Sequence, residues 1–204
     1  MDTQRAAKEL AVIRQLMERP IRFSTMSGAS GVLAGLAALG GCAADWHIST
    51  TWTGGSAFWA YAGVWGAVLA VALAGTLILT RVREVRQGMP FWSNIKKRIF
   101  LTILPTFLAG VGLTFAIAAR EYAAGSVDWG IIPAIWMIFY AVALWQVGEF
   151  APVEVRVLSV LFLASGLISA CLFQENLHAY WTLGVTFGGY HIVYGTVVWI
   201  RHGG

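Results

Sequence analysis

The sequence predicts an all-α membrane protein, a bundle of six transmembrane helices preceded by a short amphipathic helix. Of its 204 residues, 58% are hydrophobic and only 12% carry a charge, whereas a soluble domain is roughly 45–50% apolar and about 25% charged. Six stretches contain no Asp, Glu, Lys or Arg, and each has 17 to 24 residues, close to the roughly 17–25 that cross a bilayer core. These stretches are residues 23–44, 57–80, 99–119, 129–147, 157–173 and 180–200.

Each stretch is expected to be a helix, because a segment in hydrocarbon must satisfy its backbone hydrogen bonds internally. The alternating apolar and polar strand-length segments of a membrane β-barrel do not occur in the sequence. We therefore interpret residues 23–204 as one six-helix transmembrane domain.

Residues 1–22 precede the first span and are predicted to form an amphipathic helix on the cytoplasmic side. Its apolar positions share one helical face, namely Ala6, Leu10, Ile13 and Met17. A basic amphipathic helix of this kind lies in the membrane interface or docks a cytoplasmic partner. The stretch has no apolar core before a cleavage site, so we expect that no signal peptide is removed.

The basic residues predict the orientation of the chain. If the six spans alternate, thirteen of the fourteen Lys and Arg fall on one side of the membrane, and only Arg120 falls on the other. Cytoplasmic loops carry an excess of basic residues, so both termini are predicted to be cytoplasmic in a bacterial inner membrane. The net charge of +4 is assigned to loops that face anionic lipid, and no nucleic-acid partner is expected.

One ionisable side chain lies within the six predicted spans. It is His191, near the middle of the last span, and intramembrane ionisable groups are costly and often functional. Glycines share its helical face, and a similar glycine ridge occurs in the first span; such narrow faces let two helices approach closely. The six glycines assigned to helix packing are Gly28, Gly31, Gly35, Gly184, Gly188 and Gly195.

Four roles of His191 remain open, and three of them follow from the chemistry of the imidazole alone. A neutral imidazole can simply hydrogen-bond to a neighbouring helix. It can also be the polar anchor of a pocket for a small apolar ligand, with Tyr190, Tyr194, Trp136 and Tyr140 as the expected walls. Alternatively, the lone histidine can be the axial ligand of a haem or chlorin; apart from this alternative, no cofactor is expected.

The segment GASG at residues 28–31, followed by VLAGLAALG, resembles the nucleophile segment of the rhomboid intramembrane proteases. Members of that family have a six-helix core and a catalytic histidine on its last helix. The resemblance implies an alternative function as an intramembrane Ser–His hydrolase, in which His191 activates Ser30 for attack on a peptide bond.

Other reactive side chains lie near the predicted outer ends of the spans. Six of them have metal-ligand chemistry, but their spacing is unspecific, and we expect solvated loop residues and no metal site; these are Asp45, His47, Glu121, Asp128, Glu175 and His178. Cys42 and Cys171 are interpreted as buried thiols, unless the first and fifth spans are adjacent and allow a disulfide.

The layout of the chain favours a non-enzymatic role. The sequence contains no P-loop, GxSxG, HExxH or CxxC motif. Its ELxxIRQLMERxxRF, SGxSGxxAG and TFGGYHIVYG segments resemble a family of uncharacterised bacterial multi-spanning membrane proteins, and this resemblance implies no activity. We therefore expect either an interaction subunit, which binds other membrane subunits or a cytoplasmic partner, or a sensor that binds a small ligand.

Overall fold

The computed structural model describes residues 27–52, 55–86, 88, 94–124, 130–172 and 179–202. This part of the chain is helical, as the sequence predicts, and contains no strand. The amphipathic helix expected over residues 1–22 and the start of the first predicted span lie outside the described ranges.

The helices follow the predicted spans but differ from them at the ends. They are α2 (Gly28–Thr51), α3 (Gly55–Arg86), α4 (Asn94–Ala124), α5 (Ile132–Val147), α6 (Val153–Leu172), α7 (Ala179–Leu183), the π-helix η2 (Gly184–Tyr190) and α8 (His191–His202). The last three are continuous, and we call them together the final rod. Most of the helices extend beyond the uncharged stretches because a helix continues to satisfy its backbone hydrogen bonds past the edge of the apolar region.

Within the described residues, five helical segments are long and apolar enough to cross a membrane. The remaining apolar helix, α5, has 16 residues. It begins three residues after the predicted start of its span, and a proline occupies its first turn, where the ring fits the helix and no intrahelical donor is lost. The number of spans that cross the bilayer therefore stays a prediction.

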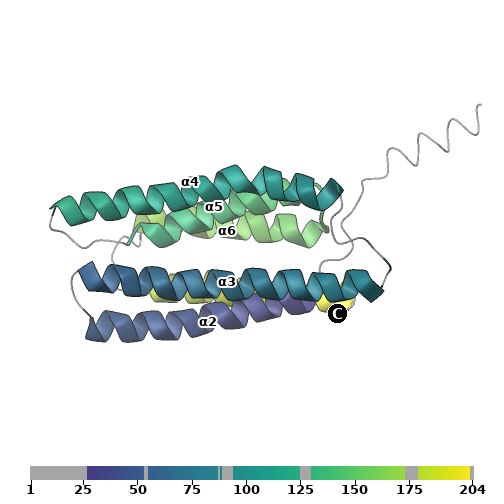
Figure 1. Ribbon diagram of the computed structural model, residues 1–204, viewed down its shortest axis with the longest axis horizontal. Coiled ribbons are helices and arrows are strands. Elements are labelled where there is room, and N and C mark those ends of the chain that lie inside the picture. The colour runs from purple at the N-terminus through teal and green to yellow at the C-terminus, as the bar shows by residue number, and fades with distance from the viewer. Residues whose placement is uncertain are drawn as a thin grey trace, which may run out of the picture.

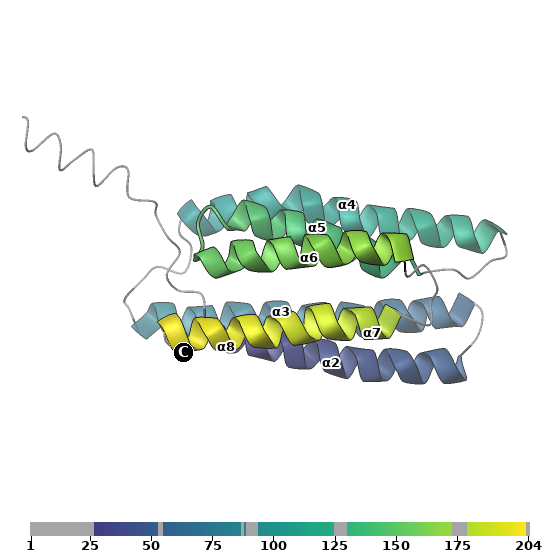
Figure 2. The ribbon, with the colours of Figure 1, turned by 180° about the vertical axis from the view of Figure 1, so that it is seen from behind.

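The helices form two layers, one of α4, α5 and α6 and the other of α2, α3 and the final rod (Figure 1 and Figure 2). In the first layer α5 packs against both α4 and α6, and in the second layer α2 packs against both α3 and α8. The two layers meet mainly where α5 and α6 face the final rod. A side chain at that contact therefore touches both layers.

The contact between α2 and α8 is made by backbone atoms. A Cβ atom added to Gly195 would lie 2.5 Å from the Val32 nitrogen and 2.6 Å from the Gly28 carbonyl oxygen. Further along α2, a Cβ atom on Gly35 would lie 2.7 Å from the carbonyl oxygen of Gly188 in η2. Since real Cβ atoms do not approach other atoms so closely, only glycine allows the two helices this separation.

The two other glycines assigned to helix packing lie along the same contact. A Cβ atom on Gly31 would lie 2.9 Å from the Cα atom of Gly195. At Gly184 the added atom would be 3.5 Å from the sulfur of Cys42, which is an ordinary van der Waals distance. The final rod therefore follows α2 closely at its α8 end and less closely at its α7 end.

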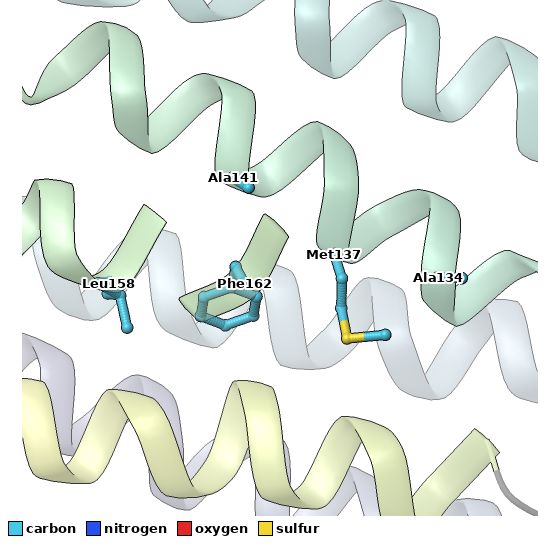
Figure 3. Packing of buried hydrophobic residues seen from close by; sticks show 5 residues of the cluster. All are labelled: Ala134, Met137, Ala141, Leu158 and Phe162. Carbon is cyan, nitrogen blue, oxygen red and sulfur yellow. The ribbon is translucent and has the colours of Figure 1, made fainter. Parts of the chain in front are cut away.

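The apolar core of the other layer lies between α5 and α6. It consists of Ala134, Met137, Ala141, Leu158 and Phe162, which Figure 3 shows from close by. Three aromatic side chains of the final rod, those of Phe187, Tyr190 and Tyr194, pack against this cluster. The core of one layer thus reaches the surface of the other.

Two ion pairs join the layers at one end of the bundle. Lys96 of α4 lies 2.6 Å from the carboxylate of Glu84 in α3, and Arg201 of α8 lies 3.1 Å from that of Glu154 in α6. The Glu84 side chain is 2% exposed. A buried carboxylate needs a partner of opposite charge, so Lys96 fixes where α4 begins relative to the end of α3.

Gly195→Ala is expected to destabilise the protein by about 1–3 kcal/mol, because the added methyl group overpacks the contact between α2 and α8. The matched control is Gly112→Ala in α4, where an added Cβ meets nothing within 4 Å. That substitution should be neutral or stabilising by up to about 1 kcal/mol, since alanine restricts the unfolded chain. Thermal unfolding of both variants in detergent measures the difference, and equal effects would contradict the close packing.

Candidate functional site

His191 lies where the two layers meet. Its imidazole belongs to the first residue of α8 and is 7% exposed. The Nε2 atom lies 2.7 Å from the hydroxyl oxygen of Tyr140, which projects from α5 in the other layer. This hydrogen bond links a residue of the final rod to a residue 51 positions earlier in the chain, and so it ties the two layers together.

Aromatic rings surround the imidazole. The ring of Phe187 is stacked on it at a centroid distance of 5.9 Å, and the ring of Phe162 stands at 67° to it with centroids 5.4 Å apart. Tyr140 contacts both the imidazole and Phe162. These rings shield His191 from solvent, so its polar atoms depend on partners within the protein.

Two polar atoms in this region are buried without a partner of good geometry among the described residues. They are Nδ1 of His191 and the hydroxyl oxygen of Tyr194. The carbonyl groups of Thr186 and Phe187 interact with the imidazole, but neither makes a well-aligned hydrogen bond to Nδ1. Buried polar groups are normally paired, so the contact between the layers carries two polar atoms whose hydrogen-bonding capacity is not used.

A π-helix leads into His191. It spans the seven residues Gly184–Tyr190. In a π-helix the backbone hydrogen bond joins residues five apart, and such segments are rare and frequent at functional sites. His191 follows the π-helix directly, and its backbone N–H donates to the carbonyl oxygen of Gly188. The π-helix therefore ends immediately before the imidazole-bearing residue.

A groove lies on the side of the molecule between α6 and the final rod. It has a volume of about 480 Å³ and is open toward the outside. Its lining combines five hydroxyl-bearing side chains with three others; the residues are Ser165, Ile168, Ser169, Trp181, Thr182, Val185, Thr186 and Tyr190. The groove is therefore amphipathic, and its lining comes from both layers.

Tyr190 connects the groove to the buried histidine. Its hydroxyl group lies 2.9 Å from the hydroxyl oxygen of Ser165 in α6, and either atom can be the donor. On its other side, the Tyr190 ring stands at 90° to the ring of Phe162, with centroids 5.6 Å apart, and Phe162 in turn contacts His191. Tyr190 and Phe162 thus lie between the groove and the imidazole.

The structure distributes the residues predicted to form a ligand pocket over three places. Tyr190 lines the groove, whereas His191 and Tyr140 lie behind it as a bonded pair and Tyr194 packs against the same core. Trp136 faces α4, where its indole nitrogen lies 3.0 Å from the hydroxyl of Thr114. The groove also includes serine and threonine residues of α6 and η2 that sequence reasoning missed, because only the packing of α6 against η2 brings them together.

Ser30 and His191 do not form a catalytic pair in this structure. The Ser30 hydroxyl donates a hydrogen bond of 2.6 Å to the carbonyl oxygen of Ser27, and the imidazole bonds to Tyr140 on the opposite layer. The helices that carry them do touch, but through the backbone: a Cβ on Gly31 would lie 3.3 Å from the carbonyl oxygen of His191. The side chain of His191 is turned away from α2.

The surroundings of His191 do not fit an axial ligand of haem or chlorin. An iron or magnesium atom needs a free ring nitrogen and space for a flat macrocycle beside it. Here Nε2 is engaged by Tyr140. Nδ1 has no such partner, but it is buried, and the rings of Phe187 and Phe162 pack against the imidazole where a macrocycle would need space.

Asp45 corrects one expectation from the sequence. The sequence predicts a solvated outer loop at this position, but α2 continues to Thr51 and Asp45 is buried, with 4% exposure. Its carboxylate accepts a hydrogen bond of 3.0 Å from the indole nitrogen of Trp65 in α3. The uncharged stretch ends before Asp45, whereas the helix continues to Thr51. The carboxylate can lie inside the bundle because the indole of Trp65 donates a hydrogen bond to it.

The cysteines and the other acidic residues supply no further site in the described part of the chain. Cys42 and Cys171 are free thiols, and Cys171 is exposed instead of buried. Among the described residues, no three His, Cys, Asp or Glu side chains come together as metal ligands. Asp128, Glu175 and His178 lie outside the described ranges.

No protein-family model matches the chain, and no curated protein or solved structure is significantly similar to it. The resemblances to rhomboid proteases and to bacterial multi-spanning proteins therefore stay predictions, and the function rests on the geometry of the site.

Tyr140→Phe is expected to destabilise the protein by about 1–3 kcal/mol, because it leaves a buried imidazole nitrogen without its partner. The control is Tyr122→Phe, since Tyr122 is 79% exposed and its loss of a hydroxyl should change stability by less than about 0.5 kcal/mol. Combining Tyr140→Phe with His191→Phe should cost less than the sum of the single variants by about 0.5–3 kcal/mol. Unfolding in detergent measures this coupling; additive effects would show that the two side chains do not interact.

Proposed function

We propose that the chain is an integral protein of a bacterial inner membrane, with six spans and both termini in the cytoplasm. The five long apolar helices support a membrane location, and α5 is apolar enough to be the sixth span if the residues before it complete its length. The ion pairs Lys96–Glu84 and Arg201–Glu154 lie at the same end of the helices as most of the basic residues. A basic end of this kind favours the cytoplasmic side.

The proposed orientation can be tested with reporter fusions. Green fluorescent protein fused after Gly204 is expected to fluoresce, because it folds in the cytoplasm, and alkaline phosphatase fused after Ala124 should be active on the outer side. Fluorescence and phosphatase activity of cells report each position. If α5 did not cross the membrane, only two spans would follow Ala124. The C-terminus would then lie outside the cytoplasm, and the fluorescent reporter fused to it would be dark.

The function that the geometry supports best is the binding of a small, largely apolar molecule in the groove between α6 and the final rod. The volume of about 480 Å³ falls within the roughly 300–1,000 Å³ of small-molecule sites, and because the groove is open on its outer side, it encloses an occupant only in part. Its apolar side chains would hold the body of the ligand, and its hydroxyl groups would orient it. This groove is the observation that carries the proposal.

Binding in the groove would affect how the two layers pack against each other, and a sensor requires such a coupling. The groove is lined by α6 from one layer and by α7 and η2 from the other, so an occupant contacts both layers at once. Tyr190 then connects the occupant to the Tyr140–His191 pair through Phe162. A ligand that favours one spacing of the layers would shift the population toward it. The N-terminal segment remains the proposed docking point for a cytoplasmic partner.

Hydrolase and haem-binding functions receive less support. The Ser30 hydroxyl and the imidazole have separate partners, so an attack by Ser30 would first require His191 to leave Tyr140. The same bond blocks a metal at Nε2. Ligand binding needs neither rearrangement.

Ile168→Trp is expected to fill the groove, because Ile168 lines it and its side chain is 52% exposed. The matched control is Leu167→Trp on the same helix, which is equally exposed at 52% but lies outside the groove lining. Organic extracts of the three purified proteins are compared by mass spectrometry. A small molecule should be present in the extracts of the wild type and the control and depleted in the extract of Ile168→Trp. Identical extracts from all three proteins would count against the proposal.

A further inference from the structure

We infer that the groove takes uncharged, bilayer-soluble molecules that carry a carbonyl or hydroxyl oxygen, and that it rejects the corresponding anions. This inference rests on the proposed function, since it names the chemical class of the same ligand. It follows from the polar groups of the groove, from the distance to the nearest ion pair and from the direction in which the groove opens.

The groove offers hydroxyl groups and no charge among the described residues. Its polar lining consists of serine, threonine and tyrosine hydroxyls and one indole; these are Ser165, Ser169, Thr182, Thr186, Tyr190 and Trp181. An ionised ligand placed here would lose water without gaining a counter-charge, which is strongly unfavourable. A neutral ligand loses much less on entering.

The nearest charged groups on α6 are too far along the helix to compensate an ion. Glu154 and Arg156 lie in its first turn, while the groove begins at Ser165. At 1.5 Å per residue, Arg156 is about 14 Å from Ser165 along the axis. In addition, Arg156 is already paired with Glu149, and Glu154 with Arg201.

The Ser165–Tyr190 pair is suited to a carbonyl or hydroxyl oxygen. The two hydroxyl groups share one hydrogen bond of 2.9 Å, so one hydroxyl hydrogen remains for a further acceptor. The Thr186 hydroxyl, by contrast, already donates to the carbonyl oxygen of Thr182 and keeps only acceptor capacity. Together they present one donor and several acceptors, which a ketone satisfies in part and an alcohol more fully.

The groove opens toward the side of the bundle, where the bilayer would lie. Trp181, Val185 and Ile168 line it with exposed side chains, which are 67%, 58% and 52% exposed. An apolar rim of this kind is compatible with lipid chains and unsuited to a water-filled entrance. The occupant therefore arrives from within the bilayer, as a lipid-soluble compound.

The inference can be tested with benzophenone and its carboxylate, para-benzoylbenzoate, on the protein in lipid nanodiscs. Both probes carry the same photoreactive ketone, whose carbon bonds to a nearby C–H carbon under near-ultraviolet light and becomes a tertiary alcohol. Peptide mass spectrometry locates the label. Labelling in the groove is expressed relative to labelling at Leu77 of α3, a lipid-facing position that is 62% exposed, so that different partitioning into the bilayer cancels.

Benzophenone should label the groove residues of α6 and the final rod in preference to Leu77, and the carboxylate should show at least about tenfold less preference. Ser165→Ala should lower the benzophenone preference about fivefold through loss of one hydrogen bond. Tyr190→Phe provides the second test of the same bond. Ser159→Ala is the matched control, because that hydroxyl also lies on α6 but bonds to the carbonyl oxygen of Ala141, and it should have no effect.

The possible results separate the inference from the function on which it rests. If both probes prefer the groove equally, or if Ser165→Ala and Tyr190→Phe leave the benzophenone preference unchanged, the inferred class is overturned and the groove remains a binding site. If neither probe prefers the groove over Leu77, the proposed binding function fails and the inference fails with it.

Discussion

The backbone contact between α2 and α8 determines where the other parts of the site lie. Because Gly28, Gly31 and Gly195 lack a Cβ atom, the two helices approach until main-chain atoms touch. In a lipid environment the hydrophobic effect contributes little between helices, and such close van der Waals packing is a main source of association. The contact fixes the axial position of the final rod, and with it the height and direction of His191.

The association of the two layers depends on a small number of polar groups. Near mid-length the Tyr140–His191 hydrogen bond spans the contact, and at one end the buried Glu84 is held by Lys96. Removing one member of such a buried pair destabilises a protein more than replacing both members by apolar side chains, since the remaining polar group stays unsatisfied. The aromatic rings around His191 add packing to the same contact. Position and polarity are thus specified together.

Much of the architecture can be read from the sequence because single-segment properties determine it. The uncharged stretches indicate the helices, and the spacing of the glycines indicates which helical faces are narrow. The prediction that His191 shares the glycine face of the last span is wrong, because the glycines face α2 and the imidazole faces α5 and α6. The ends of the helices are harder to predict. Asp45 ends a span when only charge is counted, yet its carboxylate accepts a hydrogen bond from an indole on α3, a partner that lies 20 positions along the chain.

The groove and the π-helix could not be predicted, for two different physical reasons. The groove exists only because α6 packs beside η2, and no local pattern encodes that pairing. The π-helix differs from an α-helix by a change in hydrogen-bond spacing that leaves composition unaltered. The adjacent glycines Gly188 and Gly189 are the one local signal, since glycine tolerates unusual backbone geometry, but they equally suit helix packing.

The π-helix gives the final rod a lopsided cross-section. A wider helix spreads its side chains over a larger circumference, and here the glycines and the larger residues fall on opposite sides. Gly184 and Gly188 are turned to Cys42 and Leu39 of α2, while Thr186 and Tyr190 are turned to α6. The rod is therefore narrow toward α2, where its backbone approaches closely, and wide toward α6, where its larger side chains form one wall of the groove.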